Sequence, residues 1–171
     1  MVTEFVGKLK DHLNQIKISD VSESETRETY CAYVSIESLQ IEKARGMMQY
    51  YSQLSSILLN NNVKFNGTPF IEVEKWNINK DSISYNFCFP IVQTDSLPKH
   101  PSIKYKKYKR VKALKVTYNG NYITSDRAWY KLLEHAKQNN IAIENKPVEV
   151  FFNNPNFGGD ALRWKAEVYM P

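Results

Sequence analysis

The sequence predicts an α+β fold made of two successive units, each with the element order strand, helix, strand, strand. In residues 29–92 and again in residues 111–171, a strand-like run precedes an amphipathic helical stretch and two further strand-like runs. A second observation is proline spacing, because Pro69 and Pro147 open strand-like runs about 78 residues apart. The two units share little sequence, so the repeat is one of pattern and predicts a pseudo-twofold arrangement.

The first 28 residues are expected to form a helix and a linker ahead of this domain. Residues 19–28 are polar and are typical of a linker. Residues 2–16 predict an amphipathic helix that packs on the body or leads in from an upstream segment. The apolar residues of this helix, at helical spacing, are Val2, Phe5, Val6, Leu9, Leu13 and Ile16.

The first unit is expected to begin with a strand over residues 29–36. A helix follows over 41–60, and the run of three asparagines after it favours a left-handed cap. Residues 69–76 predict a strand, residues 77–81 a turn and residues 83–89 the returning strand. The predicted inner stripe of the helix consists of Ala44, Met47, Met48, Tyr51, Leu54, Ile57 and Leu58.

Residues 91–110 are expected to link the two units, with Pro98 and Pro101 stiffening the crossing. Residues 111–118 then predict the first strand of the second unit. A turn follows at Asn119-Gly120.

The second unit continues with a helix over 126–139, for which Ser125 is the predicted N-cap. Residues 147–153 predict a strand, residues 154–160 a Pro/Gly turn and residues 162–170 the last strand. The apolar stripe of this helix is predicted to contain Trp129, Leu132, Leu133 and Ala136.

Positive charge is concentrated in one stretch of the chain. The net charge is +5, yet eight lysines and arginines lie between Lys99 and Lys115 without an acid. We expect a solvated linker and edge strand, because lysine on an edge strand prevents unwanted strand pairing. Nucleic acid or an anionic membrane are the alternatives, but no nucleic-acid motif accompanies the run. We therefore expect neither direct nucleic-acid reading nor membrane contact from this chain.

Residue types that bind metals or cofactors are sparse and scattered. Cys31 and Cys88 do not have zinc spacing, and a reduced, cytoplasmic location fits them best. The sequence contains no phosphate loop or dinucleotide fingerprint. We expect no metal and no cofactor. No catalytic triad is expected around the histidines, which are His12, His100 and His135.

Side chains alternate between the two faces of a strand, and this places one acid of the last strand opposite the core. Lys165, Glu167 and Tyr169 share the polar face, whereas Trp164 and the other alternate residues share the apolar face. When the two units are aligned from their ends, Asn86 falls opposite Glu167. A carboxylate present in only one unit is the first candidate for chemistry.

The second half of the chain resembles the GyrI-like family, which includes the effector-binding domains of AraC-type and multidrug-sensing bacterial transcription regulators. The first half resembles it mainly in the order of its elements. The matching features are Gly120, Tyr122, the Trp129 helix, Pro147, Asn154-Pro155, Trp164, Glu167 and the final Pro171.

The resemblance implies antiparallel sheets with helices on one face and a ligand groove between the two units. It also implies a small, amphipathic or cationic ligand, with Glu167 at the acidic position of the family pattern. Many members carry a DNA-binding domain ahead of this one, but the 28 residues before the repeat are too few for it. We therefore do not transfer the DNA-reading function.

We expect a small-molecule-binding domain in which Glu167 attracts a cation among aromatic rings. Two alternatives remain open: a hydrolase with Glu167 as general base, its pKa raised by burial, or a protein-binding module that uses the basic run. Glu167 could also be a surface acid paired with Lys165 or another lysine. The predicted ligand-binding residues are Glu167, Tyr169, Tyr122, Tyr118, Trp129, Trp164, Asn86, Tyr51 and Trp76.

Overall fold

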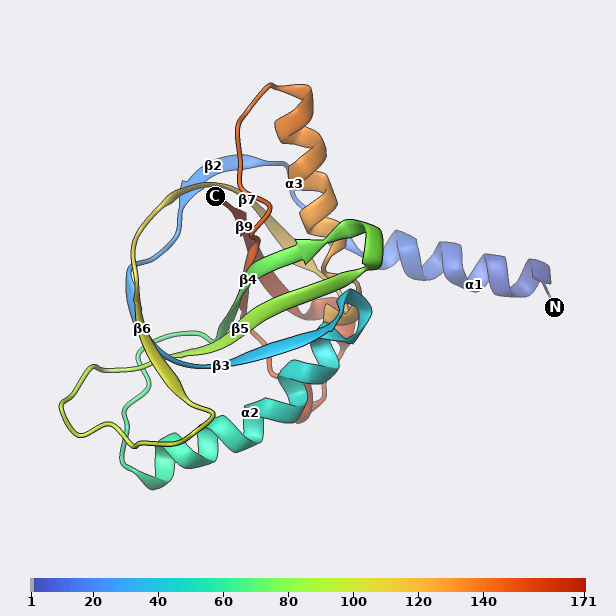
Figure 1. The fold of residues 1–171 in the computed structure, drawn as a ribbon. Helices are drawn as coiled ribbons and strands as arrows, with labels where there is room; N and C mark the ends of the chain where they lie inside the picture. Colours follow the sequence, from blue (N-terminus) through green and yellow to red (C-terminus); the bar gives the residue numbers. More distant parts are fainter. Residues whose placement is uncertain (1) are drawn as a thin grey trace.

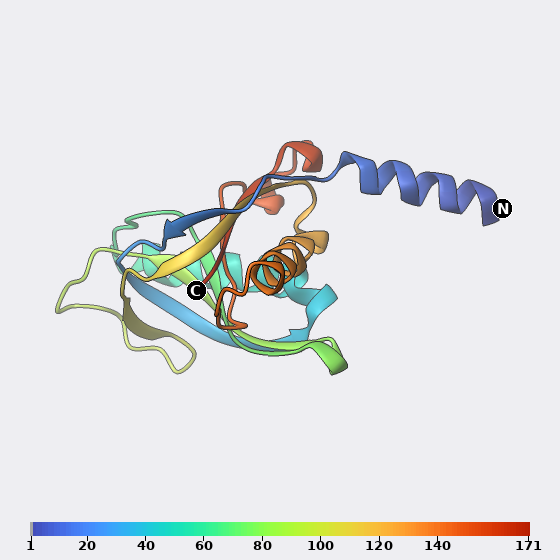
Figure 2. The ribbon, with the colours of Figure 1, turned by 90° about the horizontal axis from the view of Figure 1, so that it is seen from above.

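The computed structural model describes residues 2–171, with the exception of the side chains at positions 9 and 12–14 (Figure 1). Leu9 and Leu13 of the predicted first stripe therefore lie outside the described side chains. Helix α1 (Val2–Gln15) forms as predicted and projects away from the body in both views (Figures 1 and 2). Its apolar residues Val2 and Phe5 are exposed, so the expected packing on the body is not found.

One nine-stranded antiparallel sheet forms the body of the described chain. Its order is β1-β7-β9-β8-β4-β5-β3-β6, and β2 pairs with β7 outside this path. The strands are β1 (Lys17–Ile18), β2 (Ser22–Glu25), β3 (Thr29–Leu39), β4 (Phe70–Asn77), β5 (Ser82–Pro90), β6 (Lys104–Tyr108), β7 (Lys112–Asn119), β8 (Val148–Phe151) and β9 (Lys165–Met170).

Each half of the sheet has the predicted element order. The first is β3, α2 (Lys43–Asn60), β4 and β5, and the second is β7, α3 (Arg127–Gln138), β8 and β9. The halves meet at the seam, where β4 pairs with β8. The α+β fold class is therefore as predicted. Short 3-10 helices join these elements at Gln40–Glu42, Ile78–Lys80, Tyr122–Thr124, Pro155–Phe157 and Ala161–Arg163.

The two long helices of the body lie on the outer side of the curved sheet (Figures 1 and 2). The alternating residues of β5 and β9 predicted to be apolar pack beneath them. On α2, Met48 is 40% exposed although it belongs to the predicted stripe. The stripe residues that are fully buried there are Ala44, Met47, Leu54 and Leu58.

Three local predictions were wrong. The expected linker 19–28 contains β2, whose Ser-Glu alternation has no apolar signal but pairs its backbone with Lys112–Lys115. The expected linker 91–110 contains β6, an edge strand on β3, which agrees with the edge-strand interpretation of the basic run. Ser125 does not cap α3, because the N-cap is Asp126 and the Ser125 hydroxyl is buried beneath the helix.

A fully buried ion pair joins the two halves. The Lys43 ammonium at the start of α2 lies 2.7 Å from the Glu149 carboxylate on β8, and both side chains are 0% exposed. Lys43 also donates to the Ser125 hydroxyl, and the Trp129 indole donates to the other Glu149 oxygen at 2.6 Å. The ammonium lies 4.8 Å from the Trp129 ring centre as well. Every charged atom of this cluster therefore has partners, as a buried pair requires.

Replacing one member of this pair should destabilise the fold strongly. Lys43→Met leaves the Glu149 carboxylate buried without an ammonium, and we expect a loss of about 3–5 kcal/mol in the free energy of unfolding. Urea denaturation measures it. The double variant Lys43→Met/Glu149→Gln should be more stable than Lys43→Met alone, because the unpaired charge is gone. Lys75→Met, at an exposed position of β4, is the control. Equal stability of Lys43→Met and Lys75→Met would contradict the role of the pair.

Candidate functional site

The face of the sheet opposite the helices carries a row of side chains that crosses the seam. Strand register aligns Cys88 with Phe70, Phe70 with Val150 and Val150 with Glu167. The next row on the same face aligns Asn86, Glu72, Val148 and Tyr169. The predicted alternation of β9, with Glu167 and Tyr169 facing away from the helices, therefore agrees with the structure.

A cavity of about 720 Å³ lies over these rows, and we call it the concave groove. Its volume is in the range of sites for drug-sized molecules, roughly 300–1,000 Å³. The sheet curves around this side (Figure 1). A hydrogen bond from the Thr26 N–H to the Val111 carbonyl, beside β2, closes part of its rim. The apolar and aromatic walls are formed by Phe70, Tyr108, Val148, Val150, Phe152 and Tyr169.

Glu167 lies in the groove with three polar partners. Lys115 on β7 is 3.2 Å away, Lys165 is 3.4 Å away, and the Tyr169 hydroxyl donates a hydrogen bond of 2.8 Å. Burial acts to raise the pKa of Glu167, but the hydrogen bond from Tyr169 and the two lysines together hold it below its ordinary value. The expected rise in the Glu167 pKa is therefore wrong, and the expected pairing with lysines is present.

A second carboxylate lines the groove on the other side of the seam. Glu72 accepts from Lys106 at 3.1 Å and from the Asn86 amide at 3.3 Å. The Lys106 ammonium also lies 4.5 Å from the centre of the Tyr108 ring. Asn86 itself is buried, and it makes further hydrogen bonds to Glu74 and to Ser35. Asn86 thus orients Glu72 rather than facing the cavity.

The groove floor is apolar because both cysteines lie beneath it. Cys31 and Cys88 are fully buried in a cluster with Phe70. Burial raises the pKa of the Cys31 thiol to about 12 and that of Cys88 well above its ordinary value. Neither thiol is therefore a nucleophile at neutral pH.

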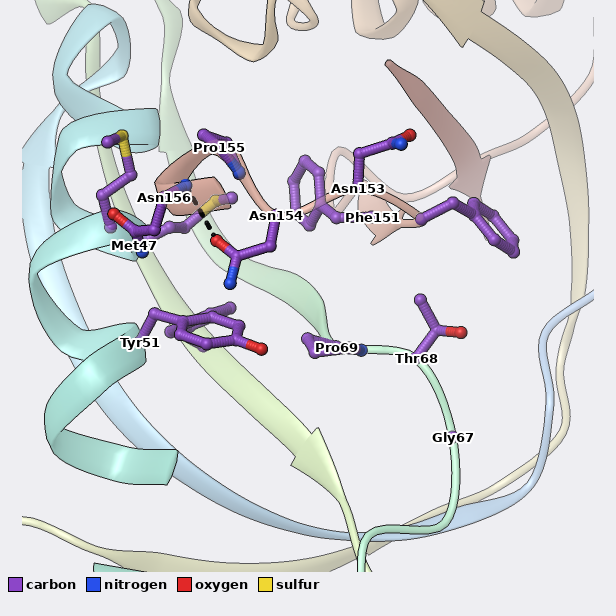
Figure 3. A pocket seen from close by; sticks show the side chains of 13 residues that line it. Met47, Tyr51, Gly67, Thr68, Pro69, Phe151, Asn153, Asn154, Pro155 and Asn156 are labelled. Carbon is purple, nitrogen blue, oxygen red and sulfur yellow. Dashed lines mark hydrogen bonds between the residues drawn. The ribbon is translucent and has the colours of Figure 1, made fainter. Parts of the chain in front are cut away.

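The other face of the seam holds a separate cavity of about 250 Å³, which we call the seam pocket (Figure 3). It lies between α2 and the loop that follows β8. Tyr51 is the one predicted ligand residue that lines it. Gly67, Thr68 and Phe152 line both this pocket and the concave groove, so the two cavities adjoin.

Most of the predicted aromatic ligand residues lie on the helix side and not in the groove. Tyr118, Tyr122 and Trp129 are 0% exposed. The Tyr118 hydroxyl donates to the Asn121 carbonyl, and the Tyr122 hydroxyl donates to the Lys165 carbonyl. These three residues are part of the core, and none of them lines the concave groove, although all three are among the predicted ligand-binding residues.

The remaining two predicted tryptophans are half-buried on the helix side. Trp76 packs against Trp129 and donates its indole N–H to the Gln40 amide at 2.7 Å. Trp164 packs against Tyr122 with ring centres 5.4 Å apart. Neither lines the concave groove.

Sequence reasoning missed much of the groove wall. The alternation in the predicted strands 69–76 and 147–153 could have placed Phe70, Val148 and Val150 on the face of Glu167. The same alternation places Glu72 beside Phe70 on that face. Tyr108 had no signal of its own, because β6 was included in a linker. Its place beside the Cys88 thiol, at 3.2 Å, depends on long-range pairing.

Four of the eight charges of the basic run are paired within the fold. Lys107 lies 2.9 Å from Glu28 and Arg110 lies 3.7 Å from Glu25, in addition to the contacts of Lys106 and Lys115 in the groove. Among the described residues, no group of three or more His, Cys, Asp or Glu side chains is arranged to hold a metal ion. No helix in residues 2–171 has the length and apolar content to span a bilayer.

Comparison with known proteins identifies the fold and no family. No family model and no curated protein matches the chain. EcmrR in a complex with DNA matches with a TM-score of 0.74 at 13% identity, over 99% of this chain and 62% of that one. The EcmrR C-terminal domain matches with a TM-score of 0.66 at 15% identity, over 89% of this chain and 96% of that one. SAV2435 bound to tetraphenylphosphonium matches with a TM-score of 0.62 at 10% identity, over 90% of this chain and 93% of that one.

The lowered pKa of Glu167 makes a prediction about acid stability. A carboxyl whose folded-state pKa lies below its ordinary value of 4.5 contributes stability above that pH and loses it as pH falls through the folded pKa. The stability difference between wild type and Glu167→Gln should therefore be largest near pH 7 and shrink below pH 4.5. Urea denaturation between pH 3 and 7 measures it, with Glu23→Gln on β2 as an exposed control. A difference that grows on acidification would contradict the pairing.

Proposed function

We propose that this chain is a ligand-binding domain of the GyrI-like type, which binds an amphipathic, cationic small molecule in the concave groove. The observation that carries the proposal is a drug-sized cavity with aromatic walls and the Glu167 carboxylate inside it. Nothing in the described residues supplies a DNA-reading element, so a role in transcription regulation would depend on another chain or domain.

A cation can reach Glu167 by replacing a lysine. Lys165 is 43% exposed and can turn its ammonium into water, and a partly exposed ion pair of this kind contributes only about 0–1 kcal/mol. Lys115 is less exposed, at 25%, and stays over the Tyr169 ring. The ligand then meets the Glu167 carboxylate. The rings of Tyr169 and Tyr108 already hold the ammonium groups of Lys115 and Lys106, so they supply apolar contact to the ligand.

The comparison with solved structures supplies a probe for testing this ligand class. The SAV2435 structure shares the fold and holds tetraphenylphosphonium, a cation surrounded by apolar rings. At 10% identity this likeness shows the fold alone, so the ligand class of our chain rests on the groove chemistry. Tetraphenylphosphonium is nevertheless a suitable probe.

The two alternatives receive less support. A general base or acid works best with a pKa near the operating pH, and the lowered pKa of Glu167 moves it away from that range. A protein-binding module would use the basic run, but half of its charges are already paired within the fold, and no further feature of the described residues favours a protein partner. We therefore propose neither turnover nor protein binding.

Replacing the Glu167 carboxylate should weaken the binding of a lipophilic cation. We expect Glu167→Gln to raise the Kd for tetraphenylphosphonium roughly five- to thirtyfold, because loss of one charge contact corresponds to about 1–2 kcal/mol. Isothermal titration calorimetry measures it. Glu167→Gln should change the Tm by only a few degrees, since Tyr169 can still donate to the amide oxygen.

Glu144→Gln is the matched control, because Glu144 lines the rim of the same groove with 68% of its side chain exposed. It removes the same charge at the exposed rim, where Glu144 pairs, among the described residues, only with Lys146, so we expect less than a twofold change in Kd at physiological salt. Equal Kd values for wild type and Glu167→Gln would contradict the proposal. A loss of affinity in Glu144→Gln as large as that in Glu167→Gln would contradict a direct contact with Glu167, because it would show that only the overall electrostatic field of the groove affects binding.

A further inference from the structure

The seam pocket differs from the concave groove in its chemistry. Its walls are Met47, Met48 and Tyr51 of α2, together with Phe87 and Phe151 of the sheet. No charged side chain lines it among the described residues, whereas the concave groove has acids and bases on every side. A charged ligand would lose its hydration here without gaining a counter-charge. The pocket therefore favours an uncharged molecule.

One buried polar group faces into this pocket. The Asn154 amide nitrogen is buried and has no hydrogen-bond partner in the described part of the chain. Figure 3 shows it directed into the space between Tyr51 and Pro69. The position of Asn154 is fixed by its other amide atom, which accepts from the backbone N–H of Asn156 at 3.0 Å.

That contact also assigns the orientation of the Asn154 amide. The backbone N–H of Asn156 is a donor, so the atom that faces it must be the amide oxygen. The NH₂ group is then the group directed toward the pocket from its wall, and it is a donor without a protein acceptor. Leaving a buried donor unpaired is unfavourable, so an acceptor oxygen is favoured at this point.

We propose that the seam pocket is a second ligand site, for a neutral molecule of one or two rings that presents an acceptor oxygen to the Asn154 amide. The cavity of about 250 Å³ exceeds the roughly 150 Å³ of an apolar cavity that binds benzene. Sulfur and ring atoms of Met47, Met48 and Tyr51 supply the apolar contacts for the ring. The inference does not depend on cation binding in the concave groove.

The test uses three probes of the same size with ¹⁵N-labelled protein and NMR titration. Acetophenone is neutral and has an acceptor oxygen, ethylbenzene lacks the oxygen, and benzoate is charged. We expect acetophenone to shift the side-chain NH₂ signals of Asn154, which are identified by their absence in Asn154→Asp. Ethylbenzene should bind roughly five- to tenfold more weakly, because the hydrogen bond is missing. Benzoate should bind more weakly than acetophenone.

Two variants locate the site. Asn154→Asp keeps an oxygen for the Asn156 N–H but removes the donor, and should weaken acetophenone binding at least tenfold. Asn79→Asp adds the same charge at an exposed position that lines neither cavity and should have less than a threefold effect. Met48→Trp fills the pocket from the α2 side, where Met48 is partly exposed, and should abolish binding with the Asn154 amide intact. It keeps the test decisive if Asn154→Asp fails to fold.

The outcomes also separate this site from the concave groove. Glu167→Gln should leave acetophenone binding unchanged, and Met48→Trp should leave the Kd for tetraphenylphosphonium within twofold. The second site is refuted by an unshifted Asn154 signal at the solubility limit of acetophenone. It is equally refuted if ethylbenzene or benzoate binds as tightly as acetophenone, or if Glu167→Gln removes acetophenone binding.

Discussion

The buried pair between Lys43 and Glu149 is the constraint on which the seam depends. It holds the start of α2 over β8, so that an element of the first half is bound to a strand of the second. Glu149 pairs in register with Ile71 of β4. A slip by one residue would turn Glu149 to the opposite face and leave Lys43 buried without a partner. The register of the seam is thereby fixed by charge as well as by apolar packing.

Both cavities follow from this register. With Glu149 facing the helices, its neighbours Val148 and Val150 must face the concave groove, where they lie between Glu72 on β4 and Glu167 on β9. On the helix side, Phe151 must face inward, and it becomes part of the seam pocket. Strand β8 thus supplies the apolar middle of the groove through Val148 and Val150, and an aromatic wall of the pocket through Phe151. Its acid, Glu149, stabilises the fold by pairing with Lys43.

Periodicity predicted every helix and most strands, because local apolar spacing decides these elements. It also placed Glu167 and Tyr169 on the correct face, since alternation needs only one strand. It could not tell that Tyr118 and Tyr122 belong to the core, because an aromatic residue suits a core and a cleft equally. The role of Glu149 depends on Lys43, 106 residues earlier, and no local pattern reports such a pair. Strand β2 was missed for the same reason, because its pairing with β7 is long-range and its residues are polar.

The lysines around Glu167 determine which cations the proposed groove can select. Lys115 and Lys165 already satisfy the carboxylate, so a small hydrophilic cation would only exchange one ammonium for another. An amphipathic cation gains in addition from apolar area buried against Phe70, Val150 and Tyr169, at roughly 25 cal/mol for each Å². Discrimination therefore comes from the walls, and the carboxylate sets the orientation of the charged end. Under the proposed function, we therefore expect the groove to bind molecules that carry charge and rings together more tightly than inorganic ions or polyamines.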